Sequence, residues 1–376
     1  MNFIQIQMSH MIPVKTCEPF RVRTGYERVL AHRVSRNFAG IAEKDGTVTK
    51  IDDKSKLVEV TYTDGTKDVF KFGEQYVEAE SLELTQPIAC AVYLGQSFKK
   101  NDVITYNTGY FTQDHFTKQL DFSIGVTANV AMLETDTTNE DSTEISQELA
   151  DKLAINPVNI RVVKLSAKSL VHKCVKIGTE VIPTDPLMIF EEDPVTSDDT
   201  IVTDEEALSM LSDLNRSTPK AKFSGKIVKI DAYTATSELS PTLSSIVTAA
   251  CADKTKAYKL AKDTDKSSEF PPVTLIPKGS KYKGVDFDDD TVMLIFHIQE
   301  YLPHGVGDKI VVCNQLKCTC ASVFSKPILT ESGTPVDLFF SQKAQNNRIV
   351  LSPILTGISS RIMEKLERDV VAEYFK

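Results

Sequence analysis

The clearest pattern along the chain is a series of short runs in which apolar and polar residues alternate. Residues 46–51, 56–63 and 66–72 alternate in this way and are rich in β-branched side chains, which favours strands. Asp64 and Gly65 lie between the second and third runs, and both residue types tolerate the positive φ of a tight turn. The pattern therefore predicts a β-hairpin formed by these two runs.

The same kind of pattern continues beyond the hairpin and predicts more strands. These predicted strands cover residues 92–98, 102–105, 123–133, 162–165, 179–182, 187–190 and 223–233. Residues 291–300 form a long, strongly apolar run, which predicts a strand. Residues 309–312 and 336–340 predict two further strands near the end of the chain.

Helical patterns are limited to three segments. Residues 243–262 have a helical composition, and between residues 358 and 374 apolar side chains recur every four residues, which predicts an amphipathic C-terminal helix. A short helix is also expected at residues 143–153, with Ser142 or Asp141 as its N-cap. The chain is therefore expected to be mainly β with some α, an α+β protein.

The composition is that of a globular protein, and the length of 376 residues suggests two to three domains. No stretch approaches the roughly 18 apolar residues that a membrane helix needs, so no membrane partner is expected. The seven cysteines are scattered and the first residues lack a signal-peptide pattern, which favours reduced thiols in a cytoplasm. Cys313, Cys318 and Cys320 lie close together, but without a fourth ligand they are expected to be buried thiols rather than a zinc site.

The net charge of −9 is unevenly distributed along the chain. Residues 134–206 contain 17 acidic and 6 basic side chains, so the rest of the chain carries a net charge of +2. The overall charge therefore does not exclude a nucleic-acid partner that is met through a few well-placed cations.

Three basic residues are candidates for phosphate binding. Lys309 follows a glycine-containing turn, and Lys317 stands eight residues later at the edge of a β region. Arg348 could take a phosphate with its planar guanidinium group. From the residue types alone, all three are better explained as solvated surface charges. The sequence also lacks the common phosphate-loop, dinucleotide-binding and serine-hydrolase motifs.

Two acidic groups are candidates for a role in metal binding. Glu140 and Asp141 precede the short predicted helix, where they could cap its N-terminus or stand beside a hydrated Mg²⁺. Asp286, Asp288 and Asp290 alternate before the apolar strand and form a rival metal site, although a solvated acidic turn is the better explanation.

The order of several short motifs is more specific than any one of them. The motifs are G-Y-E-R at 25–28, D-G-T-V-T-K-I at 45–51, N-E-D-S at 139–142, G-T-E-V at 178–181, G-D-K at 307–309 and G-T-P-V-D at 333–337. In this order the chain resembles the second half of the β subunit of multisubunit DNA-dependent RNA polymerases. The resemblance extends from about residue 8 to residue 355.

The resemblance implies roles for particular residues. Lys309 and Lys317 match two lysines that face the RNA 3′ end and the phosphates of the incoming nucleotide. Arg348 matches an arginine that contacts the triphosphate. Glu140 and Asp141 match an acidic pair near the second Mg²⁺, which accompanies the nucleotide.

The resemblance also implies what the chain needs from other subunits. His10 stands where the family has a glutamine near the RNA. The catalytic Mg²⁺ is held mainly by aspartates of the β′ partner, so this chain is expected to be an RNA polymerase subunit that is inactive alone. The reaction would be nucleotidyl transfer by a two-metal mechanism.

The family fold implies a hybrid-binding module that contains a double-psi β-barrel and ends in a C-terminal helix. Residues 1–155 and 290–376 would form this module, and residues 156–289 would form an inserted flap or wall domain.

The chain starts inside what is usually a continuous β subunit and lacks the final clamp-linked segment. It therefore resembles the C-terminal part of a split β subunit of the giant (jumbo) bacteriophage type. The expected partners are the other β fragment, the β′ fragments, DNA template, RNA transcript, nucleotides and a promoter-recognition subunit. The expected location is the host cytoplasm or a phage nucleus-like compartment during infection, or the virion. The alternative is a non-catalytic β-rich phage protein, structural or nucleic-acid binding, that keeps only the fold.

Overall fold

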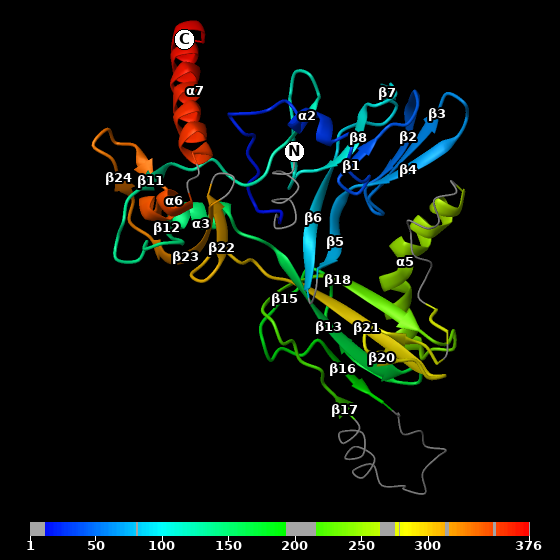
Figure 1. Cartoon of the computed structure of the whole chain (residues 1–376). Coiled ribbons are helices and arrows are strands. Elements are labelled where there is room, and N and C mark those ends of the chain that lie inside the picture. The colour runs from blue at the N-terminus through cyan, green and yellow to red at the C-terminus, as the bar shows by residue number, and fades with distance from the viewer. Residues whose placement is uncertain are drawn as a thin grey trace, which may run out of the picture.

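The computed structural model describes residues 12–79, 82–192, 216–263, 275–277, 279–312, 316–348 and 351–375. These residues form several β-sheets, a few helices and a long helix at the C-terminal end (Figure 1). The prediction of a mainly β chain with some α is confirmed at this level. None of the described helices combines the length and apolar content needed to cross a bilayer.

The largest sheet has eight strands, and all of its pairings are antiparallel. Its order is β1 (Ala39–Ile41), β8 (Val103–Asn107), β6 (Leu82–Cys90), β13 (Pro157–Ser166), β21 (Thr291–Gln299), β18 (Gly225–Thr234) and β15 (Glu180–Val181), and β5 (Gly73–Ala79) pairs with β6. Strand β21 confirms the strand predicted at 291–300, and its side chains are buried from Thr291 to Ile298. Helix α5 (Pro241–Asp263) packs on β18 and adds Leu243 and Val247 to the core.

A four-stranded sheet contains the predicted hairpin. Its order is β4 (Lys67–Lys71), β3 (Leu57–Tyr62), β2 (Gly46–Asp52) and β7 (Ser97–Phe98). The turn between β3 and β4 has Gly65 at φ +81°, and its N–H donates to the carbonyl of Tyr62. The hairpin is confirmed because its turn chemistry is entirely local.

A five-stranded mixed sheet brings distant parts of the chain together. Its order is β11 (Val130–Met132), β26 (Leu338–Phe340), β12 (Ser142–Ser146), β23 (Leu316–Phe324) and β22 (Lys309–Val312). The β11–β26 and β12–β23 pairs are parallel, and the other two are antiparallel. Helices α3 (Gln147–Lys152) and α6 (Gln342–Arg348) contribute to its buried core. Cys318 and Cys320 are buried in this core as expected, while Cys313 lies outside the described residues.

The remaining elements are short. They are α2 (Glu27–Leu30), β9 (Phe111–Gln113) with β10 (Leu120–Phe122), the sheet of β14 (Leu170–Cys174), β16 (Met188–Glu191) and β17 (Arg216–Ser217), the pair β19 (Lys281–Tyr282) and β20 (Val285–Asp286), and the pair β24 (Ile328–Leu329) and β25 (Pro335–Val336).

Three sequence predictions of regular structure are wrong in extent. The run 92–98 is a strand only at β7, because a turn at Tyr93–Gln96 with Gly95 at φ +80° interrupts it. The run 123–133 is a strand only at β11. The run 336–340 is split at Asp337, which bonds the main chain of Asn129 through both its N–H and its carboxylate.

The predicted helix at 143–153 begins too early. Residues 142–146 form strand β12, and helix α3 covers only Gln147–Lys152. Its N-cap is Ser146, whose hydroxyl accepts a hydrogen bond from the N–H of Leu149 at 3.1 Å. The expectation of Ser142 or Asp141 as the cap is therefore wrong, because pairing with β23 and β26 holds this segment extended.

The C-terminal helix α7 (Ser352–Tyr374) is confirmed, and in Figure 1 it stands away from the large sheet. No closed barrel is detected among the described residues. The division into 1–155, 156–289 and 290–376 stays a prediction. Strand β21 follows the second boundary directly and pairs with β13 and β18 of the middle segment.

Candidate functional site

The two candidate lysines lie on one exposed face of the β22–β23 hairpin. Lys309 pairs with Thr319 and Val311 pairs with Lys317, so the lysines are diagonal neighbours. Side chains on the same face of such a pair are roughly 7 Å apart at Cβ. The alternate residues of both strands face the core instead, which leaves both ammonium groups exposed. The sequence predicted the residues, and the register places them together.

The acidic pair reaches the same hairpin from a distant part of the sequence. The N–H of Thr319 donates to the carbonyl oxygen of Asp141 at 2.9 Å. Strand β12 starts at the next residue, Ser142, which pairs with Thr319. Thr319 therefore stands between Lys309 on one side and Asp141 and Ser142 on the other. Sequence reasoning missed Thr319, because only the strand register reveals its central position.

The turn that carries the acidic pair is held by short hydrogen bonds. The hydroxyl of Ser142 donates to the carbonyl of Thr137 at 2.5 Å and to that of Asn139 at 3.0 Å. Glu140 lies in the left-handed region at φ +57°, a conformation that costs a non-glycine residue about 1 kcal/mol. Both Glu140 and Asp141 are exposed. The turn thus presents two carboxylates to solvent beside the lysine face.

The described residues do not form a metal site by themselves. They contain no cluster of three or more carboxylate, histidine or cysteine groups able to hold an ion. Glu140 and Asp141 are two exposed carboxylates, a donor set that fits contact with a hydrated ion held elsewhere rather than direct chelation.

The rival metal site at the alternating aspartates is wrong for the same reason. Asp288 lies 3.4 Å from the ammonium of Lys164, and Asp290 accepts from the hydroxyl of Ser166 at 2.9 Å. Asp286 lies 3.8 Å from the ammonium of Lys281. Each carboxylate therefore has a different partner.

The last two candidates are only partly placed. Helix α6 follows β26 and ends at Arg348, so the main chain of Arg348 belongs to the same module as Lys309. His10 lies outside the described residues. Their predicted contacts with triphosphate and RNA stay predictions.

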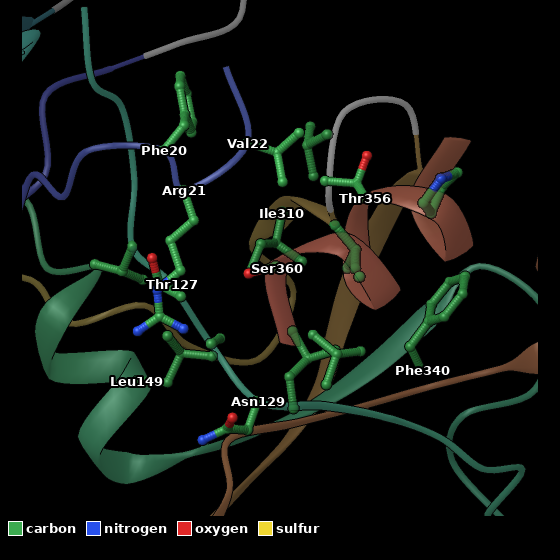
Figure 2. A pocket seen from close by; sticks show the side chains of 18 of the residues that line it. Phe20, Arg21, Val22, Thr127, Asn129, Leu149, Ile310, Phe340, Thr356 and Ser360 are labelled. Atoms are coloured by element: carbon green, nitrogen blue, oxygen red, sulfur yellow. The ribbon is translucent and has the colours of Figure 1, made fainter. Parts of the chain in front are cut away.

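A large cavity lies beside the lysine hairpin. Its volume is about 1780 Å³, and Lys309 is part of its wall. Phe20 from the N-terminal segment, Leu149 from α3, Ile310 from β22 and Phe340 from β26 line it (Figure 2). Residues of α7 complete the wall, so the cavity joins the two ends of the described chain.

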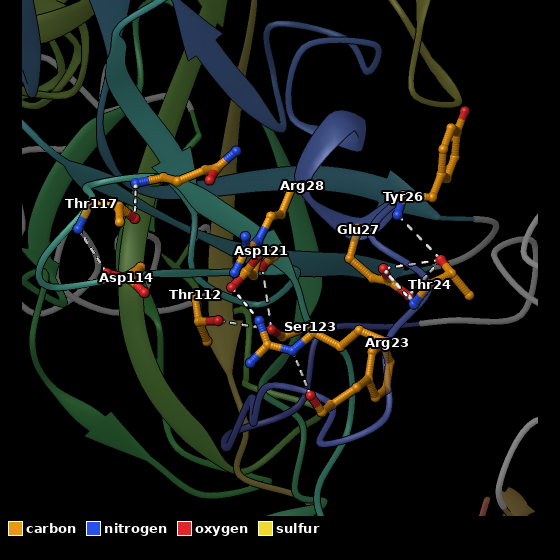
Figure 3. Close-up of polar contacts among 12 residues, drawn as sticks. Arg23, Thr24, Tyr26, Glu27, Arg28, Thr112, Asp114, Thr117, Asp121 and Ser123 are labelled. Atoms are coloured by element: carbon orange, nitrogen blue, oxygen red, sulfur yellow. Dashed lines mark hydrogen bonds and ion pairs between the residues drawn. The ribbon is translucent and has the colours of Figure 1, made fainter.

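The G-Y-E-R motif takes part in a polar network around two buried carboxylates, those of Glu27 and Asp121 (Figure 3). The buried carboxylate of Asp121 binds Arg23 at 2.5 Å and Arg28 at 3.1 Å. Glu27 accepts hydrogen bonds from the N–H and hydroxyl of Thr24. Burial by itself would raise the pKa of Glu27, but these N–H and hydroxyl donors lower it below its ordinary value. The motif therefore fixes the segment that leads to α2.

Comparison with known proteins identifies no relative: no family model matches the chain, and no curated protein matches it.

Proposed function

We propose that the chain is a β-subunit fragment of a multisubunit DNA-dependent RNA polymerase of the giant bacteriophage type. The observation that carries the proposal is the meeting at Thr319 of two segments that are distant in the sequence, the lysine hairpin at 309–319 and the N-E-D-S segment at 139–142. Lys309 and Lys317 share a face beside it, and the main chain of Asp141 is bonded to it. These are the motifs to which the family resemblance assigns nucleotide contacts.

The barrel is also part of the proposal. In the five-stranded sheet, β11 and β12 from residues 130–146 alternate with β26 and β23 from residues 316–340, β22 lies at the edge, and two of the pairings are parallel. This interleaving supports a double-psi β-barrel within a hybrid-binding module. The flap or wall domain at 156–289 is proposed on the resemblance alone.

The role of the lysines would be electrostatic. Neither Lys309 nor Lys317 has an ion-pair partner among the described residues, so both charges are available to phosphate. When the RNA 3′ oxygen bonds to the α-phosphorus and pyrophosphate leaves, fixed cations stabilise the negative charge that develops. Arg348 would bind the triphosphate and His10 would lie near the RNA.

The Mg²⁺ ions would be held mainly by the β′ partner. Glu140 and Asp141 would contact water on the nucleotide-bound ion, which is what two exposed carboxylates can do. This chain would therefore act only with the other β fragment and the β′ fragments, on DNA, RNA and nucleotides, with a promoter-recognition subunit. Its proposed location is an infected cell or the virion.

Substitution of the lysines tests the proposal in the assembled complex. Lys309→Ala and Lys317→Ala should each lower the elongation rate by about 100-fold, a typical cost for removing one group that stabilises a developing oxyanion. The matched control is Lys326→Ala, an exposed lysine just after β23. Elongation at the normal rate in both variants would favour the alternative, a non-catalytic phage protein that keeps only the fold.

A further inference from the structure

Helix α7 presents an apolar face that no other part of the described chain covers. This face is a stripe formed by Ile354, Ile358, Ile362, Leu366, Val370 and Tyr374, which follow one another at four-residue spacing and therefore wind part of the way around the helix, and all six are exposed. We infer that this α7 face and the cavity beside it bind an amphipathic helix from a separate partner polypeptide.

The α7 face continues the wall of the cavity. Ile354, Ile358, Ile362 and Leu366 line the cavity, and the apolar side chains then extend beyond it to Phe375. The opposite wall includes Ile310 of β22 and residues of β11. The result is one continuous apolar surface rather than scattered exposed residues.

Contacts with the rest of the chain set the orientation of α7. Glu364 binds Arg21 at 3.4 Å, and on α7 itself it binds Arg361 and Arg368. Arg361 also lies 3.5 Å from the side-chain oxygen of Asn129. These contacts join one flank of α7 to the N-terminal segment and to Asn129, the residue before β11, and they leave the apolar side chains of α7 exposed.

The exposed area is that of a protein interface. Eleven large apolar side chains between residues 351 and 375 are each at least 37% exposed. At roughly 150–200 Å² for a whole large side chain, they present on the order of 1,000 Å². The largest apolar patch of a typical monomer is about 300–600 Å², and a stable complex buries about 800 Å² on each partner.

The shape of the surface favours a helix as the occupant. The 23 residues of α7 extend about 34 Å, which requires an equally long element to cover them. Side chains spaced by four residues form the ridge that packs into the grooves of another helix. The cavity volume of about 1780 Å³ exceeds the roughly 300–1,000 Å³ typical of small-molecule sites.

A membrane surface is a poorer match. Helix α7 carries three basic residues, Arg361, Lys365 and Arg368, against four acidic ones. Helices that lie on anionic lipid have polar faces rich in lysine and arginine. The charge of α7 therefore favours a protein partner.

The test uses the full chain, co-expressed with the other large polymerase polypeptides of the same genome. The inference rests on the proposed function only for this choice of partners. The double variant Ile358→Asp, Ile362→Asp should weaken partner binding by at least about 100-fold, because each buried isoleucine typically contributes at least tenfold. The control is Ile177→Asp in the β14–β15 turn, since Ile177 is 61% exposed and Ile362 is 62% exposed. Circular dichroism and thermal unfolding should show all variants folded.

A photo-crosslinker in place of Ile362 identifies the occupant. It should react with one apolar-faced helical segment of another chain. Crosslinking only to a second copy of this chain, flotation of the chain with anionic vesicles, or a wild-type chain that stays alone would each overturn the inference.

Measurement of RNA synthesis on the same preparations separates the inference about α7 from the proposed function. A complex that needs α7 but makes no RNA contradicts only the proposed function, while normal assembly and RNA synthesis by the double variant contradict only the inference.

Discussion

His297 is buried between two carboxylates in the middle of the large sheet. Its Nδ1 lies 2.7 Å from Glu83 on β6, and its Nε2 lies 3.0 Å from Asp231 on β18. Lys229 binds Asp231 at 2.7 Å, and Lys283 lies 3.5 Å from Glu83. The sequence showed only a histidine inside an apolar strand, and its partners come from strands more than 60 residues away.

These contacts couple the protonation of the cluster to folding. Burial by itself would lower the pKa of His297, but hydrogen bonds with Asp231 and Glu83 raise it above its ordinary value of 6.5. Burial would likewise raise the pKa of Glu83, but His297 and the nearby lysines lower it below 4.5.

The histidine contribution to stability is present below pH 6.5 and is lost as pH rises through its raised pKa. The Glu83 contribution is present above pH 4.5 and is lost as pH falls through its lowered pKa.

Replacement of His297 should therefore change the pH dependence of stability. As the pH rises above 6.5, the wild-type free energy of unfolding should fall more steeply than that of His297→Gln, because glutamine has no proton to lose. Urea unfolding at several pH values measures this difference. The control His115→Gln, at an exposed position, should follow the wild type. If the free energy of unfolding changed equally with pH in the wild type and in His297→Gln, the raised pKa of His297 would be contradicted.

Among the residues of the candidate site, Lys309 and Lys317 were singled out by the family resemblance, and local sequence alone could neither distinguish them from surface charges nor place them together. Their juxtaposition depends on a register in which Lys309 pairs with Thr319, and no residue type encodes that register alone. Thr319 itself gave no signal in the sequence. It matters because its N–H bonds the carbonyl of Asp141, which is 178 residues earlier.

At the scale of single elements, prediction succeeded where the determining interactions are local. The β3–β4 hairpin follows from its turn residues, and α7 follows from its four-residue period. It failed at 142–146, where the flanking strands β23 and β26 come from residues 316–340. Such non-local pairing overrides the helical preference of the segment.

The start of α3 supplies a test at this scale. Ser146→Ala removes the hydroxyl that accepts from the N–H of Leu149, and loss of an N-cap typically costs about 1 kcal/mol. Amide hydrogen exchange at Leu149 should accelerate in this variant. Ser142→Ala should leave that exchange rate unchanged, because the Ser142 hydroxyl donates to Thr137 and Asn139 instead. Faster exchange at Leu149 in Ser142→Ala would instead indicate that Ser142 is the N-cap of α3, as the sequence predicted.

At the scale of the whole molecule, the candidate site is assembled from segments that the large sheet separates along the chain. Between β12 and β22 the chain contributes β13, β18 and β21 to that sheet and returns to the mixed sheet only at Lys309. The candidate site holds two exposed lysines and two exposed acidic residues, and the described part of the chain contains no metal cluster. In the proposed function, the missing chemical groups come from partner chains.

Reconstitution from separately purified chains tests this central claim most directly. The measurement is extension of an RNA primer on a DNA template with the complete set of polymerase chains, with this chain omitted, and with this chain alone. The account predicts extension only by the complete set. Extension at an equal rate without this chain, or extension by this chain alone, would contradict it.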